Sequence, residues 1–370
     1  MRILQICSAR LVGGGERHLA DLANTLAGRG HDLYAALIPK SPLRAELYAL
    51  PEQNIIQLRM RNALDVRSAL KLARFVREHQ IEVVHAHVAR DYPLAALAAK
   101  RQPNTRLIIT RHVLFPLNKL HRLTLAGVSR AIAVSQAVAN SLCTQGLLAQ
   151  HKIVVIPNGI ETSRFVQASL KDKHESSRTK FSERAPLLVG TVGHLAPIKG
   201  YEEFLRAAAV IASRRSDVDF VIVGEDKSRT GQHRAHVERL VAELGLRERV
   251  HLTGWLDDVA PTLSSFDIFV SAARIEPFGL AIVEAMACGT AIVATETEGA
   301  REIVQNGETG LLVPRGDVDA LAKSVLELLK DKDRRERIGK LARGVVQERF
   351  SLERMVDETE RIYRESLSGE

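Results

Sequence analysis

The strongest chemical signal in the sequence lies between Glu276 and Glu284, in the segment EPFGLAIVE. Gly279 lets a backbone approach a ligand closely, and a helix that starts there would aim free amide groups at an anion. Glu284 lies inside the otherwise apolar residues 280–288, where a carboxylate is costly unless hydrogen-bond donors satisfy it. The paired hydroxyls of a ribose are such donors. The alternative interpretation is that Glu276 complements the helix dipole and Glu284 pairs with an arginine.

Lys199 offers a cation that could share the same anion. It follows a predicted strand at residues 187–193 and immediately precedes Gly200 and a predicted helix. A lysine at a helix N-terminus opposes the helix dipole, so its presence there indicates a bound anion that attracts both. The alternative is an ordinary solvated loop lysine.

Three consecutive glycines, Gly13, Gly14 and Gly15, follow the first predicted strand and open a helix. Their free amides could cradle a phosphate or a sugar, whereas the simpler interpretation is a flexible turn. The pattern is not a dinucleotide-binding fingerprint. His18 stands at the position of the third glycine, and the second predicted strand ends without an acid for a ribose.

Three histidines of the first half lie on or just after predicted strands. His85 and His87 would point to one face of their strand and could form a metal-binding pair, but no third ligand at suitable spacing is visible, so zinc is improbable. His112 follows a strand at residues 106–110, at the edge where parallel sheets build their sites. Three Asp-x-Asp triplets coincide with predicted strand or helix starts, and we discount them as metal sites; they begin at Asp217, Asp317 and Asp331. We therefore expect neither a metal nor a cofactor.

Short apolar runs alternate with amphipathic stretches twice along the 370 residues, which predicts two doubly wound parallel sheets of the Rossmann-like α/β class. The predicted strands are residues 2–7, 32–38, 83–87, 106–110, 131–135 and 153–156, then 187–193, 219–223, 250–253, 268–271 and 291–294. We expect a first domain at residues 1–165, a polar linker at 166–185 and a second domain at 186–350, the two facing each other across a cleft. A final helix within residues 351–370 would pack back on the first domain.

Charge is distributed unevenly between the two halves. The net charge is +8, but residues 1–160 hold 21 Lys and Arg against 9 Asp and Glu. Only the first half is therefore expected to meet an anionic partner, either nucleic acid or a membrane surface. Aromatic residues make up 4%, too few for a platform that stacks single-stranded nucleic acid, so we expect a membrane surface and no nucleic acid as the partner. No stretch is long and apolar enough for a spanning helix or a secretory signal, and three scattered cysteines form no disulfide framework. These features predict a cytoplasmic protein.

These motifs resemble those of the retaining glycosyltransferases of the GT-B fold. The resemblance is to the large family four, which includes bacterial mannosyl-, glucosyl- and lipopolysaccharide-core transferases. The resemblance covers nearly the whole chain. Two glutamates separated by seven residues, on either side of Phe278 and Gly279, are its most specific motif. The other matching segments are Gly14-Gly15, Ala133-Val134-Ser135, Ile156-Pro157-Asn158-Gly159-Ile160, Gly193 with Lys199-Gly200, Val223-Gly224, Leu252-Thr253-Gly254 and the run from Gly307 to Val313.

The resemblance implies a nucleotide-sugar donor held mostly by the second domain. We expect a UDP-sugar in preference to a GDP-sugar. Glu284 would bind the ribose, Glu276 the sugar hydroxyls, and Lys199 with the amides of Phe278, Gly279 and Leu280 the diphosphate. The base would pack near Gly254, Trp255 and Leu256, beside Gly224, while Gly14, Gly15 and His112 would complete the site from the first domain. The family mechanism has the leaving phosphate take the acceptor's proton, so no general base is assigned; Glu276, His112 and Lys199 would act on the reacting groups.

One position departs from the family pattern. His194 stands where the family usually has an arginine, and a neutral imidazole cannot make the bidentate phosphate contact of a guanidinium. Either Lys199 carries more of the diphosphate charge, or the affinity for the donor depends on pH.

The sequence therefore predicts a retaining hexosyltransferase that acts on a glycolipid, lipopolysaccharide or other glycan acceptor in envelope polysaccharide biosynthesis. The alternatives are a sugar-nucleotide epimerase or hydrolase of similar fold, and a non-catalytic nucleotide-sugar-binding subunit. The apolar residues Leu114, Phe115 and Leu117, flanked by Arg111, Lys119 and Arg122, are expected in an exposed loop. Such a loop, together with basic residues 59–77, predicts peripheral attachment to an anionic membrane surface, on the inner face of the cytoplasmic membrane. A helix packed within the first domain is the alternative for the loop.

Overall fold

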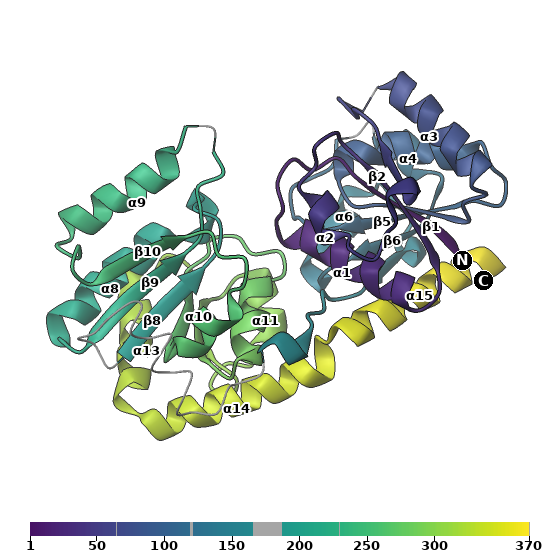
Figure 1. The fold of residues 1–370 in the computed structure, drawn as a ribbon. Helices are drawn as coiled ribbons and strands as arrows, with labels where there is room; N and C mark the ends of the chain where they lie inside the picture. Colours follow the sequence, from purple (N-terminus) through teal and green to yellow (C-terminus); the bar gives the residue numbers. More distant parts are fainter. Residues whose placement is uncertain (64, 119–120, 166–186, 229, 370) are drawn as a thin grey trace. The chain divides into compact units, whose positions relative to one another are not determined.

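The computed structural model describes residues 1–63, 65–118, 121–165, 187–228 and 230–369 (Figure 1). The chain divides into two compact units, each built on its own sheet. Unit 1 comprises Met1–Gly159 and Leu352–Glu370, and unit 2 comprises Ile160–Ser351. All strand pairs in both sheets are parallel, which confirms the predicted class of two Rossmann-like domains. Within the described ranges, no helix is long and apolar enough to cross a membrane.

Unit 1 contains a seven-stranded sheet in the order β3-β2-β1-β4-β5-β6-β7. Its strands are β1 (Arg2–Cys7), β2 (Asp32–Leu37), β3 (Ile55–Gln57), β4 (Val83–Ala86), β5 (Arg106–Arg111), β6 (Val128–Ala133) and β7 (Ile153–Val155). Its helices are α1 (Gly14–Gly28), α2 (Leu43–Glu46), α3 (Val66–Glu78), α4 (Tyr92–Lys100), α5 (His121–Leu125), α6 (Gln136–Gln145) and α15 (Leu352–Ser368). Alternate residues of the central strands serve opposite faces: Ile108 packs in the core under α1 and α15, while α4 contacts β4 and β5.

Unit 2 contains a six-stranded sheet in the order β10-β9-β8-β11-β12-β13. Its strands are β8 (Leu187–Val192), β9 (Val218–Val223), β10 (Val250–Gly254), β11 (Ile268–Ser271), β12 (Ala291–Thr295) and β13 (Leu311–Val313). Its helices are α8 (Tyr201–Arg214), α9 (Gln232–Glu243), α10 (Ala260–Ser265), α11 (Leu280–Ala287), α12 (Glu298–Ile303), α13 (Val318–Lys330) and α14 (Lys332–Arg349). Strand β9 is buried along its whole length, as expected for a central parallel strand covered on both faces.

The boundary between the units differs from the predicted one. Ile160 donates a backbone hydrogen bond to Phe350 at 3.0 Å, and Phe165 is buried against unit 2, where its short helix contacts α10 and α11. The prediction that the first domain extends to residue 165 is therefore wrong, because these pairings tie residues 160–165 to unit 2. The predicted linker at 166–185 lies outside the described residues.

Helix α15 returns to unit 1 (Figure 1, yellow) and packs on α1, β5 and β6. Its Met355, Val356, Ile362 and Tyr363 lie in the core of that unit. Arg29 of unit 1 pairs with Asp357 at 2.7 Å and with Glu360 at 2.9 Å. The last helix of the chain thus forms part of the first folding unit.

The Asp-x-Asp triplets have structural roles. Asp217 pairs with Arg215 at 2.5 Å, and Asp219 pairs with Arg249 at 3.0 Å. Asp317 and Asp331 cap the N-termini of α13 and α14 by accepting backbone hydrogen bonds at 2.8 and 2.9 Å. These four carboxylates therefore form ion pairs or cap helices within unit 2.

Candidate active site

In unit 2, the structure joins two of the predicted site residues directly. The Nζ atom of Lys199 lies 2.6 Å from an Oε atom of Glu276, although the two are 77 positions apart. Lys199 ends the turn after β8, and Glu276 lies between β11 and α11. Because β8 and β11 are neighbouring parallel strands, their carboxyl ends meet at one edge of the sheet. Both side chains are largely buried, at 27% exposed for Lys199 and 13% for Glu276.

Helix α11 begins immediately beside this ion pair. Gly279, its N-cap, has φ +112°, a conformation that a side chain would strain. Phe278 is buried and packs edge-on against Phe350, with ring centroids 5.8 Å apart, which fixes the entry into the helix. Glu284, in the second turn, is only 5% exposed. A Cβ atom on Gly279 would lie 3.5 Å from Cγ of Glu276, so the helix begins close to the ion pair, and it holds a carboxylate inside an apolar segment.

The carboxyl ends of β8, β9 and β10 meet around three glycines. Gly193 donates to the carbonyl of Val223 at 2.9 Å, and Gly224 donates to the carbonyl of Gly254 at 2.9 Å. A Cβ atom on Gly224 would lie 1.8 Å from the Gly193 carbonyl oxygen, so no side chain fits there. This packing brings Gly224, Gly254 and the residues after them into one neighbourhood with the turn that carries Lys199.

His194 stacks on Trp255 in this neighbourhood, with ring centroids 6.1 Å apart and planes 10° from parallel. The Nζ atom of Lys227 lies 4.3 Å from the Trp255 ring centroid, a cation–π contact. Burial, reinforced by Lys227 and Lys199, lowers the pKa of His194 to about 4. The imidazole is thus uncharged from pH 6 to pH 8, so the structure favours the interpretation in which lysines, rather than a titrating His194, supply the positive charge.

Lys227 was not identified from the sequence. Lys227 follows β9 within the segment VGEDK, just as Lys199 follows β8. A lysine shortly after each of two parallel strands is the sequence signal that could have identified Lys227. Leu256 follows Trp255 directly and is half-buried.

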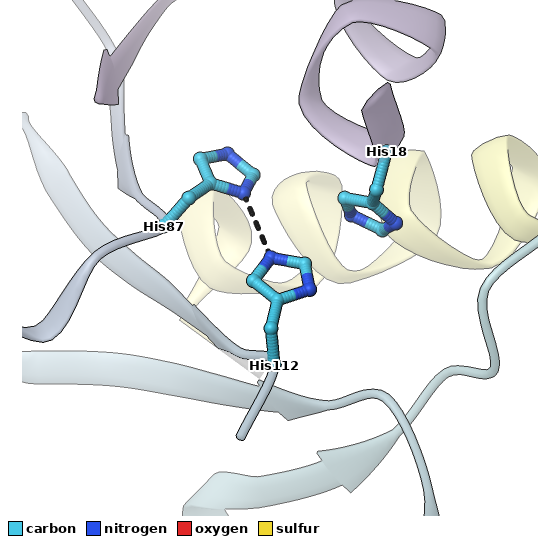
Figure 2. A group of neighbouring side chains, drawn as sticks. All are labelled: His18, His87 and His112. Carbon is cyan, nitrogen blue, oxygen red and sulfur yellow. Dashed lines mark hydrogen bonds between the residues drawn. The ribbon is translucent and has the colours of Figure 1, made fainter. Parts of the chain in front are cut away.

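In unit 1, the predicted Gly15 and His112 also meet. Helix α1 starts at Gly14, and a Cβ atom on Gly15 would lie 3.2 Å from Cγ of the His112 ring, so the glycine gives that ring its space. His87 and His18 complete the cluster: Figure 2 shows a nitrogen of His87 facing a nitrogen of His112, with His18 of α1 on the other side of His112. The His87 Nδ1 to His112 Nε2 distance is 3.5 Å, and the His18 and His112 ring centroids are 4.9 Å apart.

All three imidazoles are uncharged at neutral pH. Burial lowers the pKa of His18 to about 4 and places the pKa values of His87 and His112 well below their usual range, and the neighbouring imidazoles lower the latter two further. The Nδ1 atoms of His18 and His112 have no hydrogen-bond partner among the described residues. A neutral imidazole can donate one hydrogen bond and accept another, so the cluster suits hydroxyl groups better than a charged phosphate. His18 was noted in the sequence only because it breaks a glycine pattern.

His85 is not available to form a metal-binding pair with His87. His85 has one ring nitrogen 2.6 Å from the Tyr363 hydroxyl and the other 2.7 Å from the Thr110 hydroxyl, so neither is available. The fold instead brings His87 together with two histidines that are distant in the sequence. The possible metal-ligand atoms of His18, His87 and His112 lie within 4.8 Å of one another.

The loop predicted to meet a membrane is partly exposed. No helix forms at residues 112–118, and Phe115 is 58% exposed. Leu117, however, is buried, and its backbone N–H donates to the Gln145 side chain at 2.7 Å. Arg111 is also buried and donates to the carbonyl of Phe115. The predictions that Leu117 and Arg111 face the surface are therefore wrong, because α6 and the loop backbone engage them, and Lys119 lies outside the described residues.

The chain is similar to known proteins along most of its length. Residues 12–164 match a family described as Glycosyltransferase Family 4, and residues 172–345 match the glycosyl transferases group 1. An N-acetyl-alpha-D-glucosaminyl L-malate synthase of Bacillus anthracis is 27% identical over 96% of this chain and 95% of its own length. A lipopolysaccharide core biosynthesis glycosyltransferase of Rhizobium meliloti is 26% identical over 93% of this chain and 94% of its own. The crystal structure of a glycosyltransferase from Rickettsia africae aligns with TM-score 0.88 and 25% identity, over 100% of this chain and 99% of that one.

Proposed function

The chain belongs to the group 1 glycosyltransferases of family 4 and has the GT-B fold, and from this premise we propose that it is a retaining hexosyltransferase. It would transfer a hexose from a nucleotide sugar, with a UDP-sugar as the preferred donor over a GDP-sugar. The acceptor would be a glycolipid, a lipopolysaccharide or another glycan of the cell envelope. No metal or cofactor takes part in this proposal.

The observation that carries the proposal is the Lys199–Glu276 ion pair beside the N-terminus of α11. In a retaining transfer, negative charge grows on the departing diphosphate while positive charge grows at the anomeric carbon. A lysine and helix amides aimed at one point would stabilise the first, and a carboxylate next to them would hold sugar hydroxyls close to the second. In the ligand-free state Glu276 neutralises Lys199, so donor binding would replace this contact with one from Lys199 to phosphate.

The surrounding residues receive the remaining roles in this proposal. Lys227 would add a second cation near the diphosphate, in place of the arginine that His194 replaces. Trp255 and Leu256, after Gly254, would border the base, and Glu284 would accept hydrogen bonds from the ribose hydroxyls. From unit 1, Gly14, Gly15 and the neutral imidazole of His112 would contact the sugar. We assign no general base, since the leaving phosphate would take the acceptor's proton.

We also propose peripheral attachment to the inner face of the cytoplasmic membrane through residues 1–160. Phe115 is exposed and the segment carries the large excess of cations. An acceptor carried by a lipid would be presented at that surface.

A panel of UDP- and GDP-sugars tests the donor assignment. The donor should raise the melting temperature by mass action, and UDP-sugars should do so at lower concentration than GDP-sugars. Donor turnover, followed as release of the nucleoside diphosphate, should then be measured with candidate glycan acceptors, and the anomeric configuration of the product read by NMR. Inversion at the anomeric carbon would contradict the retaining mechanism. A new sugar epimer, or hydrolysis unaffected by any acceptor, would favour the epimerase or hydrolase alternative.

A further inference from the structure

Unit 1 contains a cavity of about 490 Å³ whose charged lining is entirely cationic. Five basic side chains line it, accompanied by Ile38, Pro39 and Met60; they are Arg10, Lys40, Arg59, Arg61 and Arg90. Among the residues that the structure describes, no carboxylate oxygen lies within 4.0 Å of any of these five cationic groups. Asp65 and Asp91 interact electrostatically with Arg61 and Arg90 and offset part of this charge. The remaining cations around the hollow repel one another unless an anion or solvent ions neutralise them.

The cavity lies at the edge of the sheet where ligands of parallel sheets bind. Arg10 follows β1, Lys40 follows β2, Arg59 and Arg61 follow β3, and Arg90 follows β4. Strands β3, β2, β1 and β4 are consecutive neighbours in the sheet, so their carboxyl ends line one continuous edge. The convergence of cations from four separate loops is produced by the topology rather than by one charged stretch of sequence.

Parts of this lining are held rigidly. Arg90 donates to the backbone oxygen of Ser8 at 2.6 Å and to its hydroxyl at 2.7 Å, which ties the guanidinium to the loop after β1. Lys40 and Met60 have φ of 59° and 38°, although neither is glycine. The backbone N–H groups of Met60 and Arg61 are fixed by the side chains of Ser68 and Asp65, at 3.3 and 3.2 Å. Left-handed backbone of this kind costs energy and is concentrated where a loop must present its groups to a ligand.

One loop connects this cavity to the histidine cluster. Arg10 lies on the loop that runs from Ser8 to Gly13, and that loop continues into Gly15, which packs against His112. The loop that carries Arg10 therefore leads directly into the glycine turn beside the histidine cluster.

We propose that this cavity is an acceptor subsite that selects acidic acceptors, by seating a phosphate or carboxylate group among Arg10, Lys40, Arg59, Arg61 and Arg90. The proposal deepens the proposed function by naming the chemical class of its acceptor. Anion binding in the cavity does not depend on the proposed function, whereas the assignment of the bound molecule as the acceptor rests on it. The anion could belong to a free small molecule or to a lipid headgroup, and these two sources share the same recognition chemistry.

Binding of inorganic phosphate tests the subsite without any transfer reaction. The protein is first saturated with UDP, so that a nucleotide site in unit 2 cannot take up the probe, and phosphate is then titrated calorimetrically at constant ionic strength. The variant Arg59→Ala/Arg61→Ala should bind phosphate at least tenfold more weakly than the wild type. The matched control Lys100→Ala/Arg101→Ala removes two exposed cations of the same unit outside the cavity and should stay within twofold.

The outcomes separate the subsite from the donor assignment. Phosphate binding that is absent, or equal in the cavity variant and the control, overturns the subsite whatever UDP does. A failure of UDP to bind contradicts the proposed function and leaves the phosphate comparison valid. Titration with glycerol 3-phosphate and with vesicles of phosphatidylinositol then distinguishes the sources. Binding of either that the cavity variant loses and the control retains supports the proposal, and binding of neither overturns it.

Discussion

At the scale of single residues, the ion pair between Lys199 and Glu276 makes the function of one depend on the other. We expect Glu276→Ala to lower donor turnover by at least 100-fold, because it removes a carboxylate placed beside the developing charges. UDP affinity should change only a few-fold, since Lys199 is retained. Release of UDP from the donor and calorimetric titration of UDP measure the two effects.

The control for this substitution is Asp217→Ala, which also breaks an ion pair in unit 2 but at the start of β9, the opposite edge of the sheet. It should leave turnover close to that of the wild type. Turnover of wild-type magnitude in Glu276→Ala would remove that residue from the proposed mechanism.

His194 provides a test of charge at a single position. Its pKa is lowered to about 4 by burial and by the two nearby lysines, so it is neutral at both pH 6 and pH 8. The substitution His194→Arg should therefore tighten UDP binding by a similar factor at both pH values, because it adds one full charge at each. A gain confined to pH 8 would show that the imidazole is already protonated at pH 6 when the diphosphate is bound.

The histidine cluster of unit 1 tests the expectation that no metal takes part. Three uncharged imidazoles could bind zinc, since only the deprotonated ring nitrogen is a ligand. We expect donor turnover to survive dialysis against EDTA, with no more than trace zinc in the protein as purified. Loss of activity on dialysis that zinc restores in the wild type, but not in His87→Ala, would contradict this.

At the scale of elements, the sequence predicted the strands that are buried on both faces and missed two of the three-residue edge strands. Strands β8 and β9 were expected because continuous apolar runs are costly anywhere but in a covered sheet. Strands β3 and β13 were missed because each has three residues at a sheet edge and its apolar run is too short to recognise. The equally short edge strand β7 was predicted because its apolar run extends over four residues, 153–156.

The candidate site shows the same division between local and non-local information. Gly279 and Glu284 were found because they share one helix and its entry, and Lys199 because it precedes a glycine and a helix. The cationic cavity could not be found, because its residues come from four loops that only the strand order brings together. The histidine cluster was hidden for the same reason: His18, His87 and His112 lie on a helix and on two separate strand ends.

Helix α15 offers a prediction about an element. The Tyr363 hydroxyl lies 2.6 Å from a nitrogen of buried His85 and 3.4 Å from the amide nitrogen of Gln5, joining the last helix to β4 and β1. Tyr363→Phe leaves these buried polar groups without that partner and should destabilise the protein by about 1–3 kcal/mol. Tyr48→Phe, which removes the same oxygen from a side chain that is 81% exposed, should be neutral. Urea denaturation curves of both variants measure the difference, and equal midpoints would contradict the buried network.

At the scale of the whole molecule, the basic excess belongs to one folding unit. Residues 1–159 carry the 21 cations and 9 acids of the first half, while the returning segment 352–370 adds 6 acids and 3 cations. Two of those acids, Asp357 and Glu360, pair with Arg29. Unit 1 therefore keeps a net charge of +9, and unit 2 is close to neutral, so long-range attraction to an anionic surface acts mainly on unit 1.

This charge and the exposed side chain of Phe115 together predict reversible membrane binding. Each cation near an anionic surface contributes roughly 1 kcal/mol, and this attraction weakens as salt shortens the screening length. The protein should sediment with phosphatidylglycerol vesicles at low salt, remain in the supernatant with phosphatidylcholine vesicles, and be released from the anionic vesicles at high salt. Phe115→Ser should weaken the binding severalfold, whereas Tyr48→Ser, which removes another exposed aromatic side chain of unit 1, should not. A protein that stays in the supernatant with both lipids at low salt would rule out the membrane surface as a partner, and an acceptor free in solution would then be the better assignment.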